Sequence, residues 1–450
     1  MLNIAYVVSL FPCWSETFIL NEIIELSKRG VNITILSLRR DVEGHVQKKA
    51  KPFIKKTRYA PPLGVLTAFM RCLKKRPRIL IALLWRVLSA RHNDCIPNGL
   101  INCDASDYYI LHGNTLISKN NSCNEDKVKK LLYSCCNYKI LSKNIWSVLV
   151  GCYFVEIVVK EKTGHIHAHF ANYPTLAAMT ISRLTGIPFT FTAHAHDVFL
   201  DKTLLQEKIE AAKAVVSISN YNRQYLLDSY QGISPVKIKV IRCGLGLTEW
   251  EFLTDLRESK EAIIVSIGRL TKMKGFEFLI RACAWLKDRR LFKCQIIGGG
   301  ELDIELQGLI NHLELSDRVS LEGVLDNSKV RERLKTATAF VLPSIWDDQE
   351  GQEGIPLVLI EAMALGIPCL ASKISGIPEL IIDGKTGMLV SPKDVKGLSD
   401  RMLELLDNNG LRKRLSLNGR AKIENEFDIA KSVDRLLEVF YFVPITNLKL

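Results

Sequence analysis

Two patterns of hydrophobic and polar positions alternate along most of this chain. Short apolar runs, typical of buried strands, are separated by longer stretches in which apolar residues recur at helical spacing. The expected strands are residues 4–9, 31–36, 165–169, 189–193, 215–219, 238–242, 263–268, 293–297, 318–322, 339–343, 368–371 and 388–390. Such alternation predicts parallel sheets covered by helices, and therefore an α/β protein with two doubly wound domains.

The alternation is lost between residues 41 and 162, which we interpret as a helical, basic insertion in the first domain. Near residues 247–260 strand-like sequence gives way to polar and charged residues, so the domain boundary is expected there. A length of 450 residues also exceeds what one core usually serves. We expect a first domain over residues 1–250, a second over 251–430 and a C-terminal helical segment over 431–450.

The positive charge of the chain is concentrated in one segment. The formal net charge is +13, and residues 48–91 contain thirteen Lys or Arg and no acidic residue. Residues 66–91 mix these cations with apolar runs, which is typical of a helix lying on an anionic membrane, although Pro77 must break or kink it. A nucleic-acid patch and a solvated basic face are the alternatives, and the bulky apolar residues favour the membrane.

Hydropathy predicts no membrane-spanning helix. Residues 79–84 form too short a run, and residues 145–159 are interrupted by Glu156 and fall below the length required. The N-terminal residues lack a basic region of the kind that opens a signal peptide. Twelve mostly isolated cysteines show no zinc-site spacing and are typical of buried apolar residues in a reducing compartment. We expect a cytoplasmic protein.

Two carboxylates, Glu353 and Glu361, lie eight positions apart around an expected helix start. Pro356 suits the first helical position, so Glu353 is expected in the preceding loop and Glu361 inside the helix. Free N–H groups at a helix start bind phosphate or sugar oxygens, and the two acids can accept hydrogen bonds from sugar and ribose hydroxyls. This arrangement favours a sugar nucleotide site, and a surface helix with an acid at each end is the alternative.

Cations and glycines follow other strands of the second domain. Arg269 and Lys274 lie where a strand gives way to a helix, and two cations there can neutralise the charge that develops on a departing diphosphate. The run from Gly298 to Glu301 lets a ligand approach the backbone or only makes a tight turn. Residues 321–324 end another strand and can offer backbone bonds to a base.

Histidines mark the first domain. His194 and His196 alternate at the end of an expected strand, and a substrate role is our interpretation for His194. Residues His165, His167 and His169 have the same spacing, but no Cys or Glu follows at ligand spacing, so a core or hydrogen-bonding role is expected rather than a metal.

The first strand is followed by a loop without the glycines of a dinucleotide fingerprint, so no cofactor is expected there. Ser15 can cap the following helix, and Glu16 in its first turn either favours the helix dipole or contacts an acceptor.

Together these motifs resemble the retaining glycosyltransferases of family four, which have the GT-B fold. The stretches 11–19 and 192–197 look like the branch that makes bacterial surface polysaccharides such as colanic acid. The resemblance implies two Rossmann-like domains facing a central cleft, with the donor on the second and the acceptor on the first. It implies no metal, retention by front-face attack, and a C-terminal helix that crosses back to the first domain.

The resemblance also assigns roles to residues of this chain. His194 and Glu353 would be catalytic, with His194 contacting the reacting sugar and Glu353 the donor sugar. The donor would be bound by Arg269, Lys274, Gly299, Glu301, Gly323, Val324, Gly354, Ile355, Pro356, Leu357 and Glu361. The acceptor would be bound by Ser15, Glu16, Thr17 and His196.

Two departures from the family pattern affect these assignments. Residues 347–352 lengthen the loop before Glu353, and Glu350 within it is not at the family distance from Glu361. Residues 243–247 lack the acid that relatives often carry after Gly244.

The resulting hypothesis is transfer of a hexosyl group from a nucleotide sugar to a lipid-linked oligosaccharide at the anionic inner membrane surface. Neither a cofactor nor a nucleic-acid partner is expected. Transfer to a soluble acceptor is the alternative within enzymes, and a basic RNA-binding protein is the alternative from another class.

Overall fold

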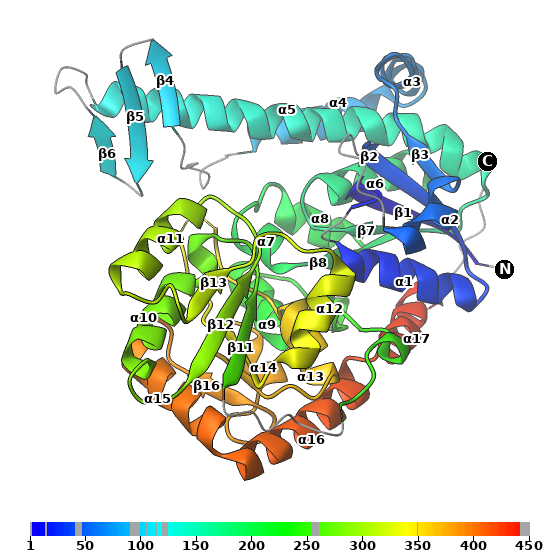
Figure 1. The fold of residues 1–450 in the computed structure, drawn as a ribbon. Coiled ribbons are helices and arrows are strands. Elements are labelled where there is room, and N and C mark those ends of the chain that lie inside the picture. The colour runs from blue at the N-terminus through cyan, green and yellow to red at the C-terminus, as the bar shows by residue number, and fades with distance from the viewer. Residues whose placement is uncertain are drawn as a thin grey trace. The chain divides into compact units, whose positions relative to one another are not determined.

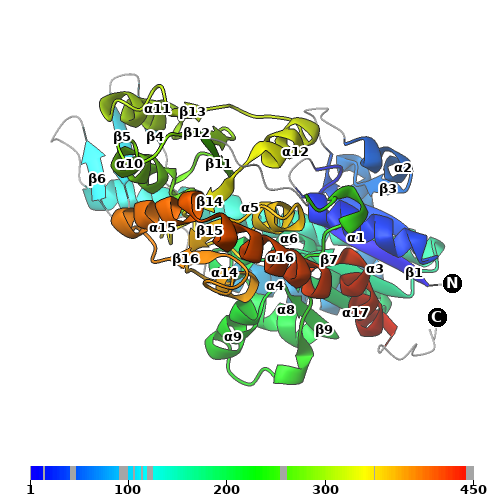
Figure 2. The same cartoon turned by 60° about the horizontal axis from the view of Figure 1, so that its bottom comes forward.

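The computed structural model describes residues 2–13, 16–40, 47–90, 100–104, 107–112, 115–118, 125–253, 261–348 and 350–441, with only the backbone for residues 100–137 and His196. The chain divides into two compact units. The first unit comprises residues 1–217, 223–240 and 435–450, and the second comprises residues 218–222 and 241–434. Each unit is built on a parallel sheet, and Figures 1 and 2 show the elements of both.

A seven-stranded parallel sheet forms the centre of the first unit, in the order β10-β9-β8-β7-β1-β2-β3. Its strands are β1 (Asn3–Leu10), β2 (Asn32–Arg39), β3 (Thr57–Tyr59), β7 (His165–His169), β8 (Phe189–Ala193), β9 (Ala214–Ser217) and β10 (Ile238–Val240). Its helices are α1 (Thr17–Lys28), α2 (Lys51–Ile54), α3 (Pro62–Lys75), α4 (Pro77–Ser89), α5 (Glu125–Lys160), α6 (Tyr173–Thr185), α7 (Ala195–Phe199), α8 (Leu205–Ala211) and most of α9 (Asn220–Ser229).

The second unit contains a six-stranded parallel sheet in the order β13-β12-β11-β14-β15-β16. Its strands are β11 (Ala262–Ile267), β12 (Phe292–Ile297), β13 (Val319–Leu321), β14 (Ala339–Leu342), β15 (Cys369–Ser372) and β16 (Met388–Val390). Its helices are α10 (Phe276–Leu286), α11 (Asp303–His312), α12 (Asn327–Thr336), α13 (Leu357–Ala364), α14 (Ile377–Leu380), α15 (Val395–Asp407) and α16 (Asn409–Glu426). Helix α17 (Ile429–Tyr441) starts in this unit and continues into the first.

Alternate strand residues face opposite layers of each sheet, which explains the nearly continuous apolar runs. In the second unit Ile264 and Val341 belong to one buried cluster, whereas Val265 and Leu342 belong to another. The α/β prediction and the twelve predicted strands are therefore confirmed, each within three residues of the observed ends.

The predicted insertion contains more than helices. Residues 57–59 form β3, which pairs in parallel with β2 at the edge of the first sheet. Residues 100–118 include a small antiparallel sheet of β4 (Leu100–Asp104), β5 (Asp107–His112) and β6 (Thr115–Ser118). These short strands escaped prediction because three to six residues give too little periodicity to identify.

One helix of the described chain is long and apolar enough, by length and composition, to cross a membrane. It is the stretch Tyr138–Lys160 of α5, of which 44% is buried within the protein. The prediction that this run is too short was wrong, because α5 extends far beyond residue 145 on its N-terminal side. The buried residues Val148, Cys152 and Phe154 pack in the main core of the first unit, as in the core helix of a globular domain.

Candidate functional site

The loop before α13 carries Glu353, and Glu361 lies inside the helix as predicted. The helix begins at Leu357 rather than Pro356, which occupies the N-cap position with an extended backbone. The prediction of Pro356 as the first helical residue was therefore wrong by one position. The N–H groups of the first turn, which have no partner within a helix, follow directly after Gly354 and Ile355.

Lys274 and Glu353 form an ion pair in the second unit, and their side chains are only 13% and 11% exposed. Lys274 ends a short 3-10 helix (Lys272–Lys274) that follows β11. The methylene groups of Lys274 lie over Gly268, where a Cβ would stand 3.1 Å from two of its carbons. The structure thus brings together one predicted cation and one predicted acid, which are 79 positions apart in the chain.

The loop of residues 347–352, which carries Glu350, packs against the 3-10 helix that contains Lys274. The Met273 N–H donates to Oε2 of Glu350 at 3.1 Å, and the Ile345 N–H donates to the Met273 carbonyl at 2.8 Å. Glu350 therefore accepts a backbone bond next to Lys274, whereas Glu353 pairs with the Lys274 side chain.

The glycines Gly298 and Gly299, which follow β12, contact the loops that follow β11 and β13. Gly298 has φ +147°, and a Cβ there would lie 1.9 Å from the Gly268 carbonyl oxygen. A Cβ on Gly299 would meet the Val324 side chain at 2.9 Å, so these two predicted donor residues lie together. The Gly298 N–H donates to the carbonyl of Gly323, which follows β13. The glycines are therefore required first for close packing of backbone on backbone.

Three other predicted donor residues have exposed side chains. Arg269 and Glu301 are exposed, and Val324 is 74% exposed. These residues follow β11, β12 and β13, at the carboxyl ends where doubly wound sheets bind ligands.

Burial raises the pKa of Glu361 to about 7, and Arg331 on α12 partly offsets this effect. The Arg331 guanidinium also lies over the ring of Trp250 at 4.6 Å and 3.6 Å from Glu249. Sequence reasoning missed Arg331, because nothing in its surroundings along the chain distinguishes it from other surface cations.

In the first unit, His194 follows β8 and is 7% exposed. The His194 backbone N–H donates to Asp197 Oδ1 at 2.9 Å, and the imidazole contacts the rings of Phe18 and Phe170, with centroids 4.7 and 4.6 Å away. Burial lowers the pKa of His194 well below its usual value, with a further contribution from His169. The imidazole is therefore held in place and neutral.

The other predicted acceptor residues differ from expectation. Because β8 ends at Ala193 and His196 lies in α7, His194 and His196 do not share a strand face, and that prediction was wrong. The side chain of His196 and the whole of Ser15 lie outside the described residues. Glu16 occupies the N-cap position of α1 without a capping side-chain bond, rather than the first turn, and Thr17 is the first helical residue.

Glu16 lies in an electrostatically unusual position. Burial raises its pKa to about 7, partly offset by His169 and Arg39, and its Oε2 has no hydrogen-bond partner among the described residues. The carboxyl group of Glu16 is thus within electrostatic range of His169 and of Arg39 at the end of β2.

A cavity of about 80 Å³ lies in the first unit at the carboxyl ends of β1 and β2. Its lining includes two cations, Arg39 and Lys143, and two aromatic residues, Trp146 and Tyr173. The Lys143 ammonium lies 5.5 Å from the Tyr173 ring. Sequence reasoning missed this cavity because its residues come from β2, α5 and α6.

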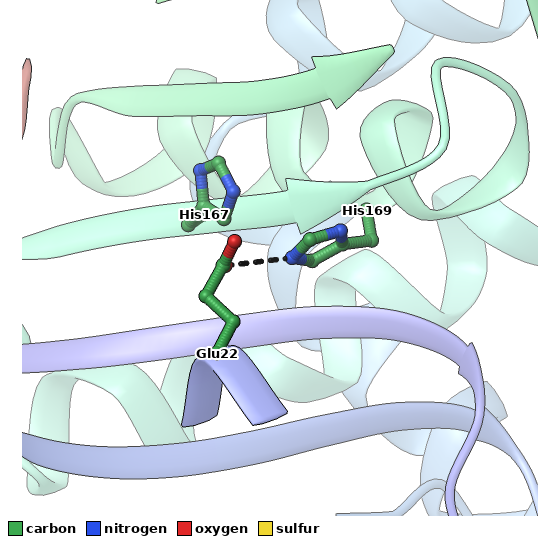
Figure 3. A group of neighbouring side chains, drawn as sticks. All are labelled: Glu22, His167 and His169. Carbon is green, nitrogen blue, oxygen red and sulfur yellow. Dashed lines mark hydrogen bonds and ion pairs between the residues drawn. The ribbon is translucent and has the colours of Figure 1, made fainter. Parts of the chain in front are cut away.

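His169 of β7 forms a hydrogen bond with Glu22 of α1, whose carboxyl group points toward it (Figure 3). The spacing of Glu22, His167 and His169 would allow them to hold a metal ion. However, His167 bonds Thr190 Oγ1 at 2.8 Å and Thr192 Oγ1 at 3.1 Å. The predicted hydrogen-bonding role of these histidines is confirmed, although the search along the chain missed their Glu partner.

Two family models match adjacent parts of the chain. "Glycosyl transferases group 1" matches residues 249–422, and "Glycosyltransferase Family 4" matches residues 134–249. Among curated proteins, the putative colanic acid biosynthesis glycosyltransferase WcaL of Salmonella typhimurium is 34% identical over 200 residues, which are 44% of this chain and 49% of that protein. The amylovoran biosynthesis glycosyltransferase AmsK of Erwinia amylovora is 35% identical over 211 residues, 46% of this chain and 51% of that protein. The chain thus spans about half the length of these relatives.

Solved structures share the fold over nearly the whole chain. A glycosyltransferase from Rickettsia africae covers 98% of each chain with a TM-score of 0.63 and 18% identity. HepE from Anabaena, solved in complex with UDP and glucose, covers 98% of this chain and all of that chain with a TM-score of 0.64 and 14% identity. The fold is therefore GT-B. Across residues 134–422 the chain is thus similar in sequence to two glycosyltransferase families, and over nearly its whole length it shares the fold of solved glycosyltransferases.

Proposed function

We propose that this protein is a retaining, metal-independent glycosyltransferase that moves a hexosyl group from a nucleotide sugar to a lipid-linked oligosaccharide during bacterial surface polysaccharide synthesis. The observation that carries this proposal is the Lys274–Glu353 pair beside the start of α13. It sets a cation for phosphate and an acid for sugar hydroxyls next to free helix N–H groups. Relatives named for colanic acid and amylovoran synthesis support the pathway class.

The donor is bound by the second unit in this proposal. Arg269 and Lys274 neutralise the diphosphate, and Glu353 accepts bonds from the sugar hydroxyls. The backbone from Gly354 to Leu357 approaches the sugar and phosphate oxygens. Glu361 bonds the ribose hydroxyls, and a carboxyl group with a pKa of about 7 can donate or accept such bonds near neutral pH.

The remaining predicted donor residues contact the nucleoside and its phosphates in this proposal. Gly299, Glu301, Gly323 and Val324 follow the carboxyl ends of β12 and β13, where a base and its ribose bind in doubly wound sheets.

Catalysis then depends on electrostatic stabilisation of the leaving group. As the glycosidic bond to phosphate breaks, negative charge builds on the diphosphate oxygens, and two preorganised cations lower that barrier without a metal. A front-face attack lets the departing phosphate take the acceptor's proton, so the acceptor oxygen bonds to the anomeric carbon on the side that the phosphate leaves. The anomeric configuration is then retained.

The acceptor is bound by the first unit in this proposal. His194 contacts the transferred sugar, and Glu16, Thr17, Ser15 and His196 contact the acceptor. The residues Arg39, Lys143, Trp146 and Tyr173 at the small cavity offer aromatic rings that stack on sugar faces and cations that bind phosphate. A relative from Escherichia coli, 27% identical over 308 residues, is named as a galactosyltransferase that acts on a diphosphoundecaprenol-linked sugar.

Helices α3 and α4 support a peripheral location on the cytoplasmic membrane surface. Six large apolar side chains of these helices are at least 56% exposed, namely those of Leu63, Leu66, Met70, Ile81, Trp85 and Leu88. Between and beside them are the cations Arg71, Lys74, Lys75, Arg76, Arg78 and Arg86. Exposed apolar side chains flanked by cations are the combination that binds anionic lipid surfaces.

The test is a transfer assay with purified protein, a panel of UDP-, GDP- and ADP-hexoses, and saccharides linked either to a lipid diphosphate or to a soluble glycoside. We expect transfer to the lipid-linked form, with the donor's anomeric configuration retained in the product by proton NMR. The Lys274→Ala variant should lose about 10²–10³-fold in kcat, whereas Lys272→Ala in the same short helix should retain it.

Several results would overturn the proposal. They are an inverted product, equal transfer by the Lys274→Ala variant and the wild-type protein, and no release of nucleoside diphosphate from any donor. Transfer only to the soluble glycosides would replace the lipid-linked acceptor with a soluble one.

A further inference from the structure

A chain of hydrogen bonds connects Glu22 of α1 with His194 in the first unit. The Tyr6 hydroxyl donates to Oε1 of Glu22 at 2.7 Å, and the same oxygen lies 3.0 Å from Nε2 of His169. The other ring nitrogen of His169, Nδ1, lies 3.3 Å from Nε2 of His194. Tyr6 and His169 are at most 1% exposed, whereas the Glu22 side chain is 17% exposed.

The direction of each hydrogen bond follows from the atoms that take part. An ionised carboxylate only accepts hydrogen bonds, so His169 must carry its proton on Nε2 to donate to Glu22. In the neutral form of His169 the single N–H is then on Nε2, and Nδ1 is an acceptor. His194 must then donate from Nε2, which leaves its own Nδ1 without a proton. No hydrogen bond to this Nδ1 occurs within the part of the chain that the structure describes.

Other contacts already fix the position of the His194 ring. Phe18 and Phe170 lie against it, and the His169 ring is stacked on it with centroids 5.6 Å apart. Asp197 holds the His194 backbone N–H and also accepts the Ala171 N–H. Packing therefore sets the orientation of the imidazole, while the hydrogen-bond chain decides which nitrogen is protonated.

Glu22, His167 and His169 are close enough to hold a metal ion. Their existing hydrogen bonds favour the hydrogen-bond chain instead. Both ring nitrogens of His167 are engaged by threonine hydroxyls, and both ring nitrogens of His169 are engaged by Glu22 and His194. A metal ion held by one nitrogen of each histidine would have to displace at least two of these bonds. The hydrogen-bond chain leaves all of them in place.

We propose that Glu22 and His169 are positioning residues that keep His194 in its Nε2–H tautomer, so that Nδ1 accepts a hydrogen bond from a hydroxyl of the transferred sugar. This inference rests on the proposed contact between His194 and that sugar. It adds a specificity requirement, because a sugar lacking the matching hydroxyl leaves Nδ1 unpaired in a buried site.

The experiment combines NMR of protein labelled with ¹⁵N-histidine and transfer kinetics of matched variants. We expect the His194 signals, assigned from the His194→Gln spectrum, to have the neutral Nε2–H pattern in the full-length wild-type protein. His169→Phe removes the acceptor and should change that pattern and lower kcat/KM about 10- to 100-fold. His165→Phe, on the same strand and equally buried, should retain both, because the bond of His165 within the described residues is to Thr190 and not to the chain of Glu22, His169 and His194.

A conservative substitution separates positioning from folding. In His169→Asn the side-chain carbonyl can still accept the His194 Nε2–H, so the tautomer and most of the activity should return even though the contact with Glu22 is lost. Glu22→Gln keeps an acceptor oxygen for His169 and should likewise retain the wild-type tautomer.

Three outcomes would overturn the inference. They are an Nδ1–H pattern for His194 in the wild-type protein, a tautomer unchanged in His169→Phe, and a stoichiometric metal in the purified protein that Glu22→Ala removes. The NMR result does not depend on turnover. If wild-type protein shows the Nε2–H tautomer but transfers no sugar, then the proposed function fails while the assignment of the proton stands.

Discussion

At the residue scale, the surroundings of Glu361 change the pH at which its carboxyl group ionises. Its side chain is half-buried in α13, and desolvation by burial raises its pKa from 4.5 to about 7. Between about pH 4.5 and pH 7, Glu361 therefore carries a proton in the folded protein but is already ionised in the unfolded chain. Stability contributed by the protonated form is fully present below about pH 4.5 and is lost as the pH rises through about 7.

This pH dependence is testable with a single substitution. Wild-type protein should lose stability relative to Glu361→Gln as the pH rises from 4.5 to 7.5, by up to roughly 3 kcal/mol, since one pKa unit corresponds to about 1.4 kcal/mol. Denaturant unfolding of both proteins at several pH values gives the difference. A constant difference across this range would contradict the raised pKa.

The same substitution separates stability from binding. Glu361→Gln retains an acceptor oxygen and a donor for the ribose hydroxyls, so it should keep part of the donor affinity, whereas Glu361→Ala should lose most of it. Isothermal titration with the nucleoside diphosphate compares the two variants directly. Equal affinity in Glu361→Ala and wild-type protein would remove Glu361 from the site.

At the scale of elements, the loops after β11 and β12 pack so closely that a glycine is required. Gly298→Ala would place a Cβ 1.9 Å from the Gly268 carbonyl oxygen, in a backbone conformation that L-residues rarely adopt. We expect a loss of at least about 2 kcal/mol in the free energy of unfolding. Gly308→Ala in α11 is the matched control, because its Cβ meets nothing within 4 Å and alanine favours helix by up to about 1 kcal/mol.

Both variants can be measured by denaturant unfolding with the same probe. A Gly298→Ala protein as stable as the wild type would show that the two loops separate easily, and the glycine run would then have no packing role.

Helices α3 and α4 give a second prediction at this scale. The double variant Trp85→Ser and Arg78→Glu removes one exposed ring and reverses one charge, so binding to vesicles containing anionic lipid should fall at least tenfold in moderate salt. Sedimentation with vesicles measures the bound fraction. Ile304→Ser in the second unit, which also removes a highly exposed apolar side chain, should leave vesicle binding unchanged. Equal losses in the two proteins would contradict a surface confined to α3 and α4.

At the scale of the whole molecule, ligand binding to the second unit should raise thermal stability. A nucleotide sugar at a hundred times its dissociation constant stabilises the form that binds it by about 2.7 kcal/mol. We expect one class among UDP-, GDP- and ADP-sugars to raise the melting temperature by several degrees. The increase should disappear in Lys274→Ala and persist in Lys272→Ala. Equal shifts with all three nucleotides would show that the base is not recognised.

The sequence by itself determined the fold class and placed the candidate donor residues at the ends of strands and at one helix start. Apolar runs and helical periods repeat within a few residues, so they report local structure directly, and all twelve predicted strands were found. Glu353 and Glu361 share one loop and one helix, and their spacing along the chain therefore fixes their relation at the start of α13.

Only the tertiary structure decided which distant residues meet. Glu22 reaches His169 across 147 positions, and Arg39, Lys143 and Tyr173 line one cavity from three separate elements. Arg331 approaches Glu361 from α12 in the same way. Parallel strands are connected by long crossovers, so residues that are far apart in the sequence come into contact. The pattern of apolar and polar positions along the chain does not predict which of them meet. The tautomer of His194 and the pKa of Glu361 depend on these long-range contacts and on burial, and therefore on the folded chain alone.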